Sequence, residues 1–147
     1  MNITNKVKIF CEEAYAETIW CKELLGGLQK ELKKRRLAFE LCAQFVAPNE
    51  EEIICLIGMS HSWLKNLISK YNESSCVPII LSSLSALDIE GKYHLVGPDM
   101  KAAAKELKES LISAGRTKIA LYGASYSADL DKDRTLIFHQ LVKQPSD

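Results

Sequence analysis

Short apolar runs alternate with amphipathic segments of helical period along this chain, and this alternation restricts the fold more than any other feature. Strands that are separated by helices pair in parallel, because the crossover helix returns the chain to the same end of the sheet. The unbroken apolar run at residues 53–59 indicates a central strand that is buried on both faces. The sequence therefore predicts an α/β fold: a three-layer open parallel sheet flanked by helices.

The boundaries of the expected elements follow from the apolar period and from turn-forming residues. Strands are predicted over residues 7–11, 37–46, 53–59, 77–81, 93–97 and 117–123. Helices are predicted over residues 17–36 and 60–72, from Pro98 to about Ala114, and from Asp131 to about Lys143. Gly115 is expected to end the third of these helices as a C-terminal cap.

Composition and charge exclude several classes of protein. The chain has 147 residues, with 19 Lys plus Arg against 19 Asp plus Glu, so no overall field attracts nucleic acid or a membrane surface. No apolar run reaches the ~18 residues of a membrane span, and no signal-like segment begins the chain. The five cysteines, an odd number without a Cys-x-x-Cys pair, are typical of reduced thiols. We expect a cytoplasmic protein without membrane contact.

Motifs for catalysis and for metal binding are incomplete. Ser60 and Ser125 each lie between a predicted strand and a predicted helix, where a hydrolase nucleophile would stand, but both lack the second glycine of that motif. Asp129, Asp131 and Asp133 lack the glycine and the closing Glu of a calcium loop, so we expect them to cap the last helix and pair with an arginine. The sequence predicts no catalytic residue, no metal site and no cofactor, and hence no enzyme.

Two features of the first long helix have structural explanations. The basic residues at positions 30–36 lie at a helix end, where the helix dipole favours cations, so a solvated face is expected rather than contact with nucleic acid. Gly26 and Gly27 each cost the helix up to ~1 kcal/mol relative to Ala. Their presence predicts that the helix packs closely on the sheet or on a partner.

The loops that follow the strands are the expected place for a ligand, because open parallel sheets bind ligands at the carboxyl ends of their strands. The first such loop begins at Glu12 and leads to Tyr15 and Trp20. Trp20 can pack the helix onto the sheet or stack on a sugar ring or base, and its spacing alone favours the core. Arg134 follows another such loop, and its fork of donors suits hydroxyls or carboxylates.

Seven short segments stand in order along the chain, at residues 18–21 (TIWC), 24–29 (LLGGLQ), 77–81 (VPIIL), 96–100 (VGPDM), 111–116 (LISAGR), 118–121 (KIAL) and 134–138 (RTLIF). Taken together, they resemble the ligand-binding core of the lactose-repressor family of bacterial transcription regulators. That core has the fold of periplasmic sugar-binding proteins. The chain departs from the family pattern at Met100, Arg116 and Ile137.

The resemblance implies a function and a set of ligand contacts. Residues 1–97 would form the first lobe of an effector-binding domain, and residues 98–147 the start of an incomplete second lobe. A small effector, most simply a sugar, would contact Tyr15, Trp20, Ser83 and Arg134. We expect a homodimer that reaches DNA only through a headpiece absent from this chain. The alternatives are a transport-type sugar-binding protein and a small serine hydrolase.

Overall fold

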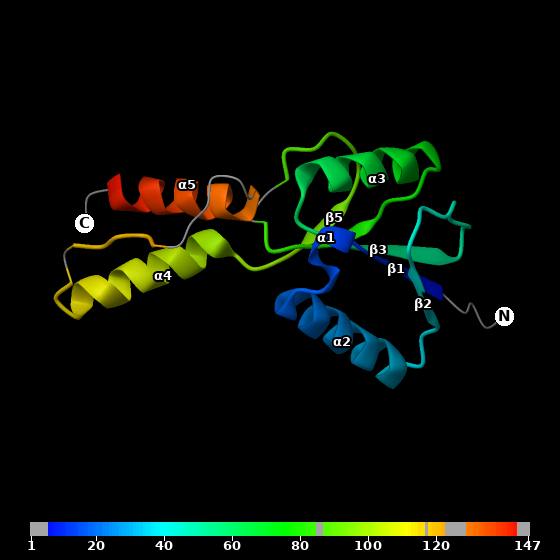
Figure 1. The fold of residues 1–147 in the computed structure, drawn as a ribbon, viewed down its shortest axis with the longest axis horizontal. Coiled ribbons are helices and arrows are strands. Elements are labelled where there is room, and N and C mark those ends of the chain that lie inside the picture. Colours follow the sequence, from blue (N-terminus) through cyan, green and yellow to red (C-terminus); the bar gives the residue numbers. More distant parts are fainter. Residues whose placement is uncertain (1–5, 85–86, 117, 123–128, 144–147) are drawn as a thin grey trace. The chain divides into compact units, whose positions relative to one another are not determined.

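The computed structural model describes residues 6–84, 87–116, 118–122 and 129–143 (Figure 1). Five parallel strands form one sheet in the order β2-β1-β3-β4-β5. The strands are β1 (Lys6–Cys11), β2 (Phe39–Cys42), β3 (Glu52–Ile57), β4 (Ile79–Leu81) and β5 (His94–Val96). Helices flank the sheet, so the predicted α/β class with an open parallel sheet is confirmed, and β3 is the central strand, as its apolar run predicted.

The helices are α1 (Glu13–Ala16), α2 (Ile19–Lys34), α3 (His61–Glu73), α4 (Met100–Ser113) and α5 (Asp129–Lys143). The chain divides into two compact units. The first unit comprises Met1–Ser82 and Asp88–Val96 and contains the sheet with α1, α2 and α3. The second comprises Ser83–Leu87 and Gly97–Asp147 and contains α4 and α5.

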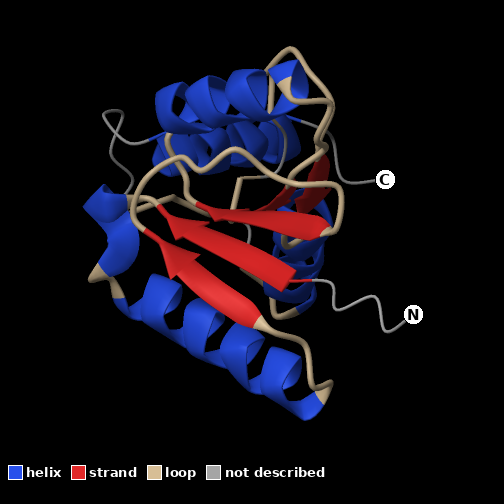
Figure 2. Ribbon diagram, turned by 90° about the vertical axis from the view of Figure 1, so that its right-hand side faces the viewer, coloured by secondary structure: helices blue, strands red, loops and turns tan. Residues whose placement is uncertain are grey.

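The sheet of the first unit lies between α2 and α3, which cover opposite faces (Figures 1 and 2). Successive residues of a strand point to opposite faces of the sheet. On one face of β3, Cys55 and Ile57 pack in the cluster beneath α2. Ile54 and Leu56 alternate with them, point to the other face and are also buried. Burial of both faces explains why this strand is apolar without interruption.

The helix predicted over residues 17–36 corresponds to α2 alone, and a separate short helix, α1, precedes it in the loop expected from Glu12 onward. Thr18 has an extended backbone, with φ −70° and ψ 149°, and its hydroxyl donates a 2.6 Å hydrogen bond to the Tyr15 carbonyl. The Tyr15 carbonyl also accepts the Thr18 N–H at 2.9 Å, so both donors of Thr18 bond the last turn of α1 where that helix ends. The prediction missed α1 because the break depends on one threonine rather than on Pro or Gly.

Strand β2 is shorter than the predicted run over residues 37–46, because the chain leaves the sheet after Cys42. The ring of Phe45 then packs on the ring of Tyr71 in α3, with centroids 4.9 Å apart. The Tyr71 hydroxyl also donates to the Val46 carbonyl at 3.4 Å. These contacts with α3 hold the chain away from the strand direction.

The cap predicted at Gly115 is confirmed, with Gly115 at φ +76°. The Gly115 N–H donates to the Ile112 carbonyl at 2.9 Å, and the Arg116 N–H donates to the Leu111 carbonyl at 2.8 Å. This pair of bonds is the Schellman arrangement, which requires a left-handed residue. Arg36 and Ser75 take the same conformation after α2 and α3, with φ of 57° and 56°.

In the second unit α4 and α5 pack against each other. Helix α4 begins at Met100 rather than at Pro98, and Asp99 is its N-cap, since the Asp99 carboxylate accepts a 2.9 Å hydrogen bond from the Ala102 N–H. The predicted sixth strand is wrong for residues 118–122, which the structure describes outside the sheet. Ile119 instead lines a small apolar hollow together with side chains of α4 and α5, while Thr117 and Gly123 lie outside the described residues.

The glycines of α2 do not pack closely on any of the described residues. A Cβ placed on Gly26 or Gly27 would meet no described atom within 4 Å, and both residues are exposed. The prediction that they bring the helix close to the sheet is therefore wrong, whereas the alternative, close packing on a partner, stays a prediction. None of the helices in the described part of the chain is long and apolar enough to span a membrane.

Candidate functional site

A hollow of about 300 Å³ opens at the carboxyl ends of β1 and β2. It lies beside the topological switch point, where α2 leads from β1 to one side of the sheet and α3 leads from β3 to the other. Open α/β sheets bind ligands at this place. The lining residues come from β1, α1, β2, the loop after β2, and α3: Phe10, Cys11, Glu12, Glu13, Ala14, Cys42, Ala43, Phe45, Trp63 and Leu67.

Glu12 bridges the switch point. Its backbone N–H continues the ladder from β1 to β3 by donating to the Ile57 carbonyl at 2.8 Å. Its carboxylate oxygen Oε2 accepts hydrogen bonds from the N–H groups of Met59, at 2.9 Å, and Ser60, at 3.0 Å. The residue is only 5% exposed, so the two amides compensate the loss of water around a buried carboxylate.

Gly58 makes the close approach of Glu12 possible. A Cβ at this position would lie 2.9 Å from Glu12 Oε2 and 2.6 Å from Cζ3 of the Trp63 ring. Any larger residue would have to displace the ring, the carboxylate or both. Gly58 therefore determines where the carboxylate and the indole stand.

Aromatic contacts fix the opposite wall of the hollow. The Tyr71 ring lies between Phe10 and Phe45, at centroid distances of 5.9 Å and 4.9 Å. The Lys70 ammonium stands 5.6 Å from the Phe45 ring centroid, within the range of a cation–π contact. The loop after β2 is thus attached to α3, and the wall that it forms is held in place.

The thiols at the hollow are protonated at neutral pH. Burial, with a smaller contribution from Cys21, raises the pKa of Cys11 to about 11. Burial is also the main cause that raises the pKa of Cys42. A protonated thiol is a poor nucleophile and a poor metal ligand. Both cysteines therefore act as weakly polar lining residues of the hollow and not as reactive groups.

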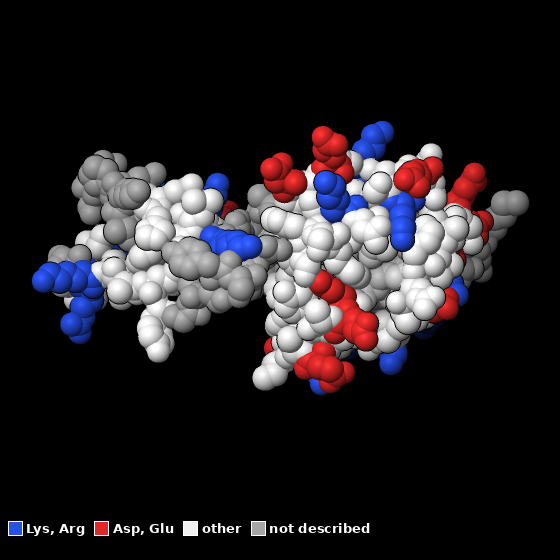
Figure 3. All heavy atoms as spheres, turned by 45° about the horizontal axis from the view of Figure 1, so that its top comes forward, with Lys and Arg blue, Asp and Glu red and all other residues white. Residues whose placement is uncertain are grey.

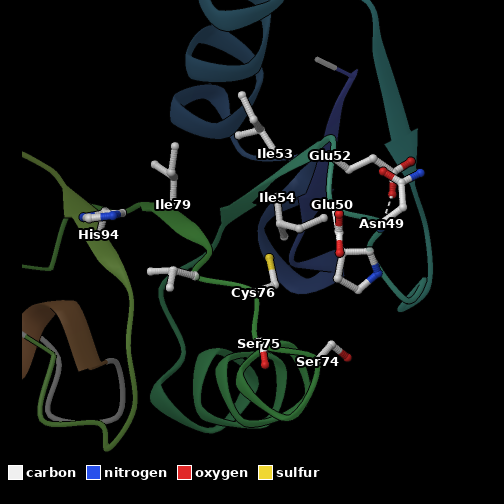
Figure 4. Close-up of a pocket in the computed structure, with 12 residues that line it drawn as sticks. Asn49, Glu50, Glu52, Ile53, Ile54, Ser74, Ser75, Cys76, Ile79 and His94 are labelled. Atoms are coloured by element: carbon white, nitrogen blue, oxygen red, sulfur yellow. Dashed lines mark hydrogen bonds between the residues drawn. The ribbon is translucent and has the colours of Figure 1, made fainter. Parts of the chain in front are cut away.

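A larger hollow, of about 790 Å³, lies at the amino ends of β3 and β4. In Figure 4, Asn49 and Glu50 stand at one side of it and His94 at the other, with isoleucines between them. The polar groups near Asn49 already have partners: the Asn49 N–H donates to Glu52 at 3.0 Å, and Glu52 pairs with Lys8 at 2.8 Å. Ligands of open parallel sheets bind at the other edge, so the smaller hollow is the better candidate.

The structure places the four predicted ligand contacts in different units. Tyr15 and Trp20 belong to the first unit, where their ring centroids lie 6.2 Å apart. Trp20 packs against the core cluster beneath α2, and neither ring is among the side chains that line the carboxyl-edge hollow. Ser83 and Arg134 belong to the second unit.

Arg134 has a partner in its own helix. Its Nη1 lies 3.8 Å from the Asp131 carboxylate, one turn earlier in α5, as the sequence predicted, and its side chain is 46% exposed. Ser60 takes the N-cap position of α3, but its side chain makes no capping bond within the described chain; the Ser60 N–H donates to Glu12 instead. Ser125 lies outside the described residues.

Sequence reasoning found the carboxyl-edge loop at Glu12 but missed Cys42, Phe45 and Trp63. Gly58 was the available signal, because a glycine directly after a buried strand often marks a close approach by another group. The residues near Gly58 in the sequence do not show which groups approach it, because Glu12 lies 47 residues before Met59, whose N–H it accepts.

Comparison with family models, with curated proteins and with solved structures finds no significant match to this chain. The surface in Figure 3 shows acidic and basic side chains interspersed over the first unit. On that face the described residues form no continuous basic surface of the kind that binds nucleic acid.

Proposed function

We propose that this chain is a non-catalytic binding module that holds a small hydroxylated molecule, such as a sugar, in the carboxyl-edge hollow. The observation that supports it most is the buried Glu12 carboxylate beside the Trp63 ring at the switch point. A carboxylate accepts hydrogen bonds from hydroxyls, and an indole face packs on the apolar face of a sugar ring. The volume of about 300 Å³ suits a small ligand.

Binding is favoured over catalysis by the chemistry of the wall. The two thiols that line the hollow, Cys11 and Cys42, have pKa values raised by burial. Glu12 already accepts two backbone hydrogen bonds, which suits a fixed acceptor better than a group that must gain and lose a proton during turnover.

Thermal unfolding against a panel of sugars and nucleosides tests this proposal. A ligand at about a hundred times its dissociation constant should add roughly 2.7 kcal/mol of stability. Ala43→Leu should abolish the shift, because Ala43 is exposed and lines the hollow. Ala47→Leu is the matched control, since Ala47 is also exposed, lies on the same loop and is not among the lining residues. An equal shift in both variants would contradict the proposal.

The wider role implied by the resemblance is a separate hypothesis: effector sensing in a cytoplasmic, homodimeric transcription regulator. In that role Tyr15, Trp20, Ser83 and Arg134 would contact the effector. Trp20→Ala and Arg134→Ala should then remove a ligand-induced shift that Ala43→Leu leaves intact. The opposite pattern favours the carboxyl-edge hollow alone.

A further inference from the structure

The loop that leads from β3 into α3 has the geometry of an oxyanion site. In parallel α/β sheets, backbone N–H groups at such a loop, next to a helix N-terminus, bind phosphate and other oxyanions. Here the N–H groups of Met59 and Ser60 converge on one point, and α3 continues from it for 13 residues.

A side chain already occupies that point. Glu12 Oε2 lies 2.9 Å from the Met59 nitrogen and 3.0 Å from the Ser60 nitrogen, and Glu12 is 5% exposed. Although Glu12 holds the N-cap position of α1, its side chain makes no capping bond to that helix within the described residues. The absence of a Cβ at Gly58 leaves room for the carboxylate, which would otherwise meet it at 2.9 Å.

The charge of the hollow agrees with this arrangement. Glu12 and Glu13 both line it, and among the described residues no Lys, Arg or His does so. The nearby Lys70 ammonium stands over the Phe45 ring and is not among the lining residues. An anionic ligand would therefore meet two carboxyl groups and no cationic lining side chain, whereas an uncharged hydroxyl can donate to either.

We infer that Glu12 is an internal plug of an oxyanion site and that it makes the hollow selective against phosphorylated and other anionic ligands. For the identity of the ligand this inference rests on the proposed function, but its test does not. The predicted ligand class is uncharged and hydroxylated, so a sugar is accepted and its phosphate ester is rejected.

Inorganic phosphate is the probe, added at constant ionic strength against chloride while thermal unfolding is followed. Wild-type protein should show no shift of its midpoint. Glu12→Ala frees both amides, so its unfolding midpoint should rise with phosphate concentration. Glu13→Ala is the matched control, because it removes a neighbouring carboxyl group from the same hollow without freeing the amides, and it should show no gain. Equal gains in both variants, or a phosphate shift in wild type, would overturn the inference.

A second measurement covers the case in which Glu12→Ala does not fold. Glu12→Gln keeps an oxygen that can accept both N–H groups and removes only the charge. In a Trp20→Phe background, Trp63 is the one remaining tryptophan. Quenching of its fluorescence by iodide should rise in Glu12→Gln relative to quenching by uncharged acrylamide. An unchanged ratio would show that the charge of Glu12 does not exclude anions and would overturn the inferred selectivity.

The failures of the two proposals are distinguishable. If no sugar or nucleoside stabilises the protein but Glu12→Ala gains a phosphate response, the plug stands and the ligand proposal fails. If a sugar stabilises wild type and its phosphate ester does so equally, the hollow binds ligand and the plug inference fails.

Discussion

The ammonium nitrogen of Lys8 lies 2.8 Å from a carboxylate oxygen of Glu52, and the two side chains are only 9% and 8% exposed. Glu52 also accepts a hydrogen bond from the Asn49 N–H. The pair therefore connects β1, β3 and the loop before β3 at the amino edge of the sheet. Each member of a buried pair compensates the lost hydration of the other, so removing one member is costly.

We expect Glu52→Gln to lower the free energy of unfolding by about 2 kcal/mol, because Lys8 loses its charged acceptor. Urea denaturation measures the change. Glu40→Gln is the matched control: it breaks the Lys6–Glu40 pair at the same edge, whose side chains are 43% and 48% exposed. That variant should change stability little. Equal losses in the two variants would contradict the assigned role of burial.

The same pair predicts a loss of stability in acid. The hydrogen bond from Lys8 is the main cause that lowers the pKa of Glu52 below its ordinary value of 4.5. A carboxyl group with a lowered folded-state pKa stabilises the protein above its unfolded-state pKa, and that contribution disappears as the pH falls through the folded-state value. Urea midpoints from pH 6 downward should therefore fall less steeply in Glu52→Gln than in wild type.

Gly26→Ala and Gly27→Ala should each stabilise the protein by up to about 1 kcal/mol. Both positions are inside α2, and an added Cβ meets no described atom within 4 Å, so alanine gains helix propensity without a clash. Gly58→Ala is the contrasting variant and should destabilise, since its Cβ would lie 2.6 Å from the Trp63 ring. Chemical denaturation of the three variants checks this prediction, and destabilisation by Gly26→Ala would contradict it.

Asn72 holds the segment before β5 against the end of α3. Its amide nitrogen donates to the Lys92 carbonyl at 2.9 Å, and its oxygen accepts from the Lys92 N–H at 2.6 Å. We expect Asn72→Ala to cost about 1–2 kcal/mol, and hydrogen exchange at Lys92 should accelerate. Unchanged protection of the Lys92 amide would show that the segment is held by other contacts.

Gly91 precedes Lys92, which Asn72 bonds, and has φ +126°. A Cβ added to Gly91 would lie 2.7 Å from the Asn72 side-chain oxygen. Gly91→Ala should cost about 2 kcal/mol or more, because strain and a clash add. Gly115→Ala is the control, since Gly115 also has a positive φ but has no described atom within 4 Å of its virtual Cβ. It should cost only about 1 kcal/mol. Equal costs would mean that the contact with Asn72 is unimportant.

Stability should also fall in alkali. Burial raises the pKa of Cys55 from 9.0 to about 12. The unfolded chain therefore loses this thiol proton near pH 9 while the folded chain keeps it. Stability decreases as the pH rises above 9 and continues to do so up to the folded-state value, by up to about 1.4 kcal/mol per pH unit. Urea midpoints at pH 8 and 10 should differ less in Cys55→Ala than in wild type, and an equal difference would contradict this origin.

The sheet could be predicted because its signal is local. The apolar run of β3 and the alternation of strands with helices specify parallel pairing without knowledge of any distant contact. Strand β2 could not be delimited in this way, since its end depends on the packing of Phe45 against Tyr71, 26 residues later in the chain. The run at residues 118–122 has strand composition, yet it lies outside the sheet, and Ile119 lines a hollow with side chains of α4 and α5.

The candidate site could be predicted only in part. The rule that ligands bind at the carboxyl edge directs attention to Glu12. The contact that defines its role joins it to Met59 and Ser60 across the switch point, and no spacing within the sequence encodes that contact. Trp20 is the converse case. It is easily noticed in the sequence as a candidate ligand contact, but in the structure it packs on the core cluster.

The most direct test of the account is to map a stabilising ligand onto the backbone amides by NMR. We predict that the largest shift changes fall on residues 10–14 and on Cys42, Ala43, Phe45 and Trp63, which line the carboxyl-edge hollow. Changes concentrated on residues 48–54 and 74–79, around the amino-edge hollow, would contradict the account.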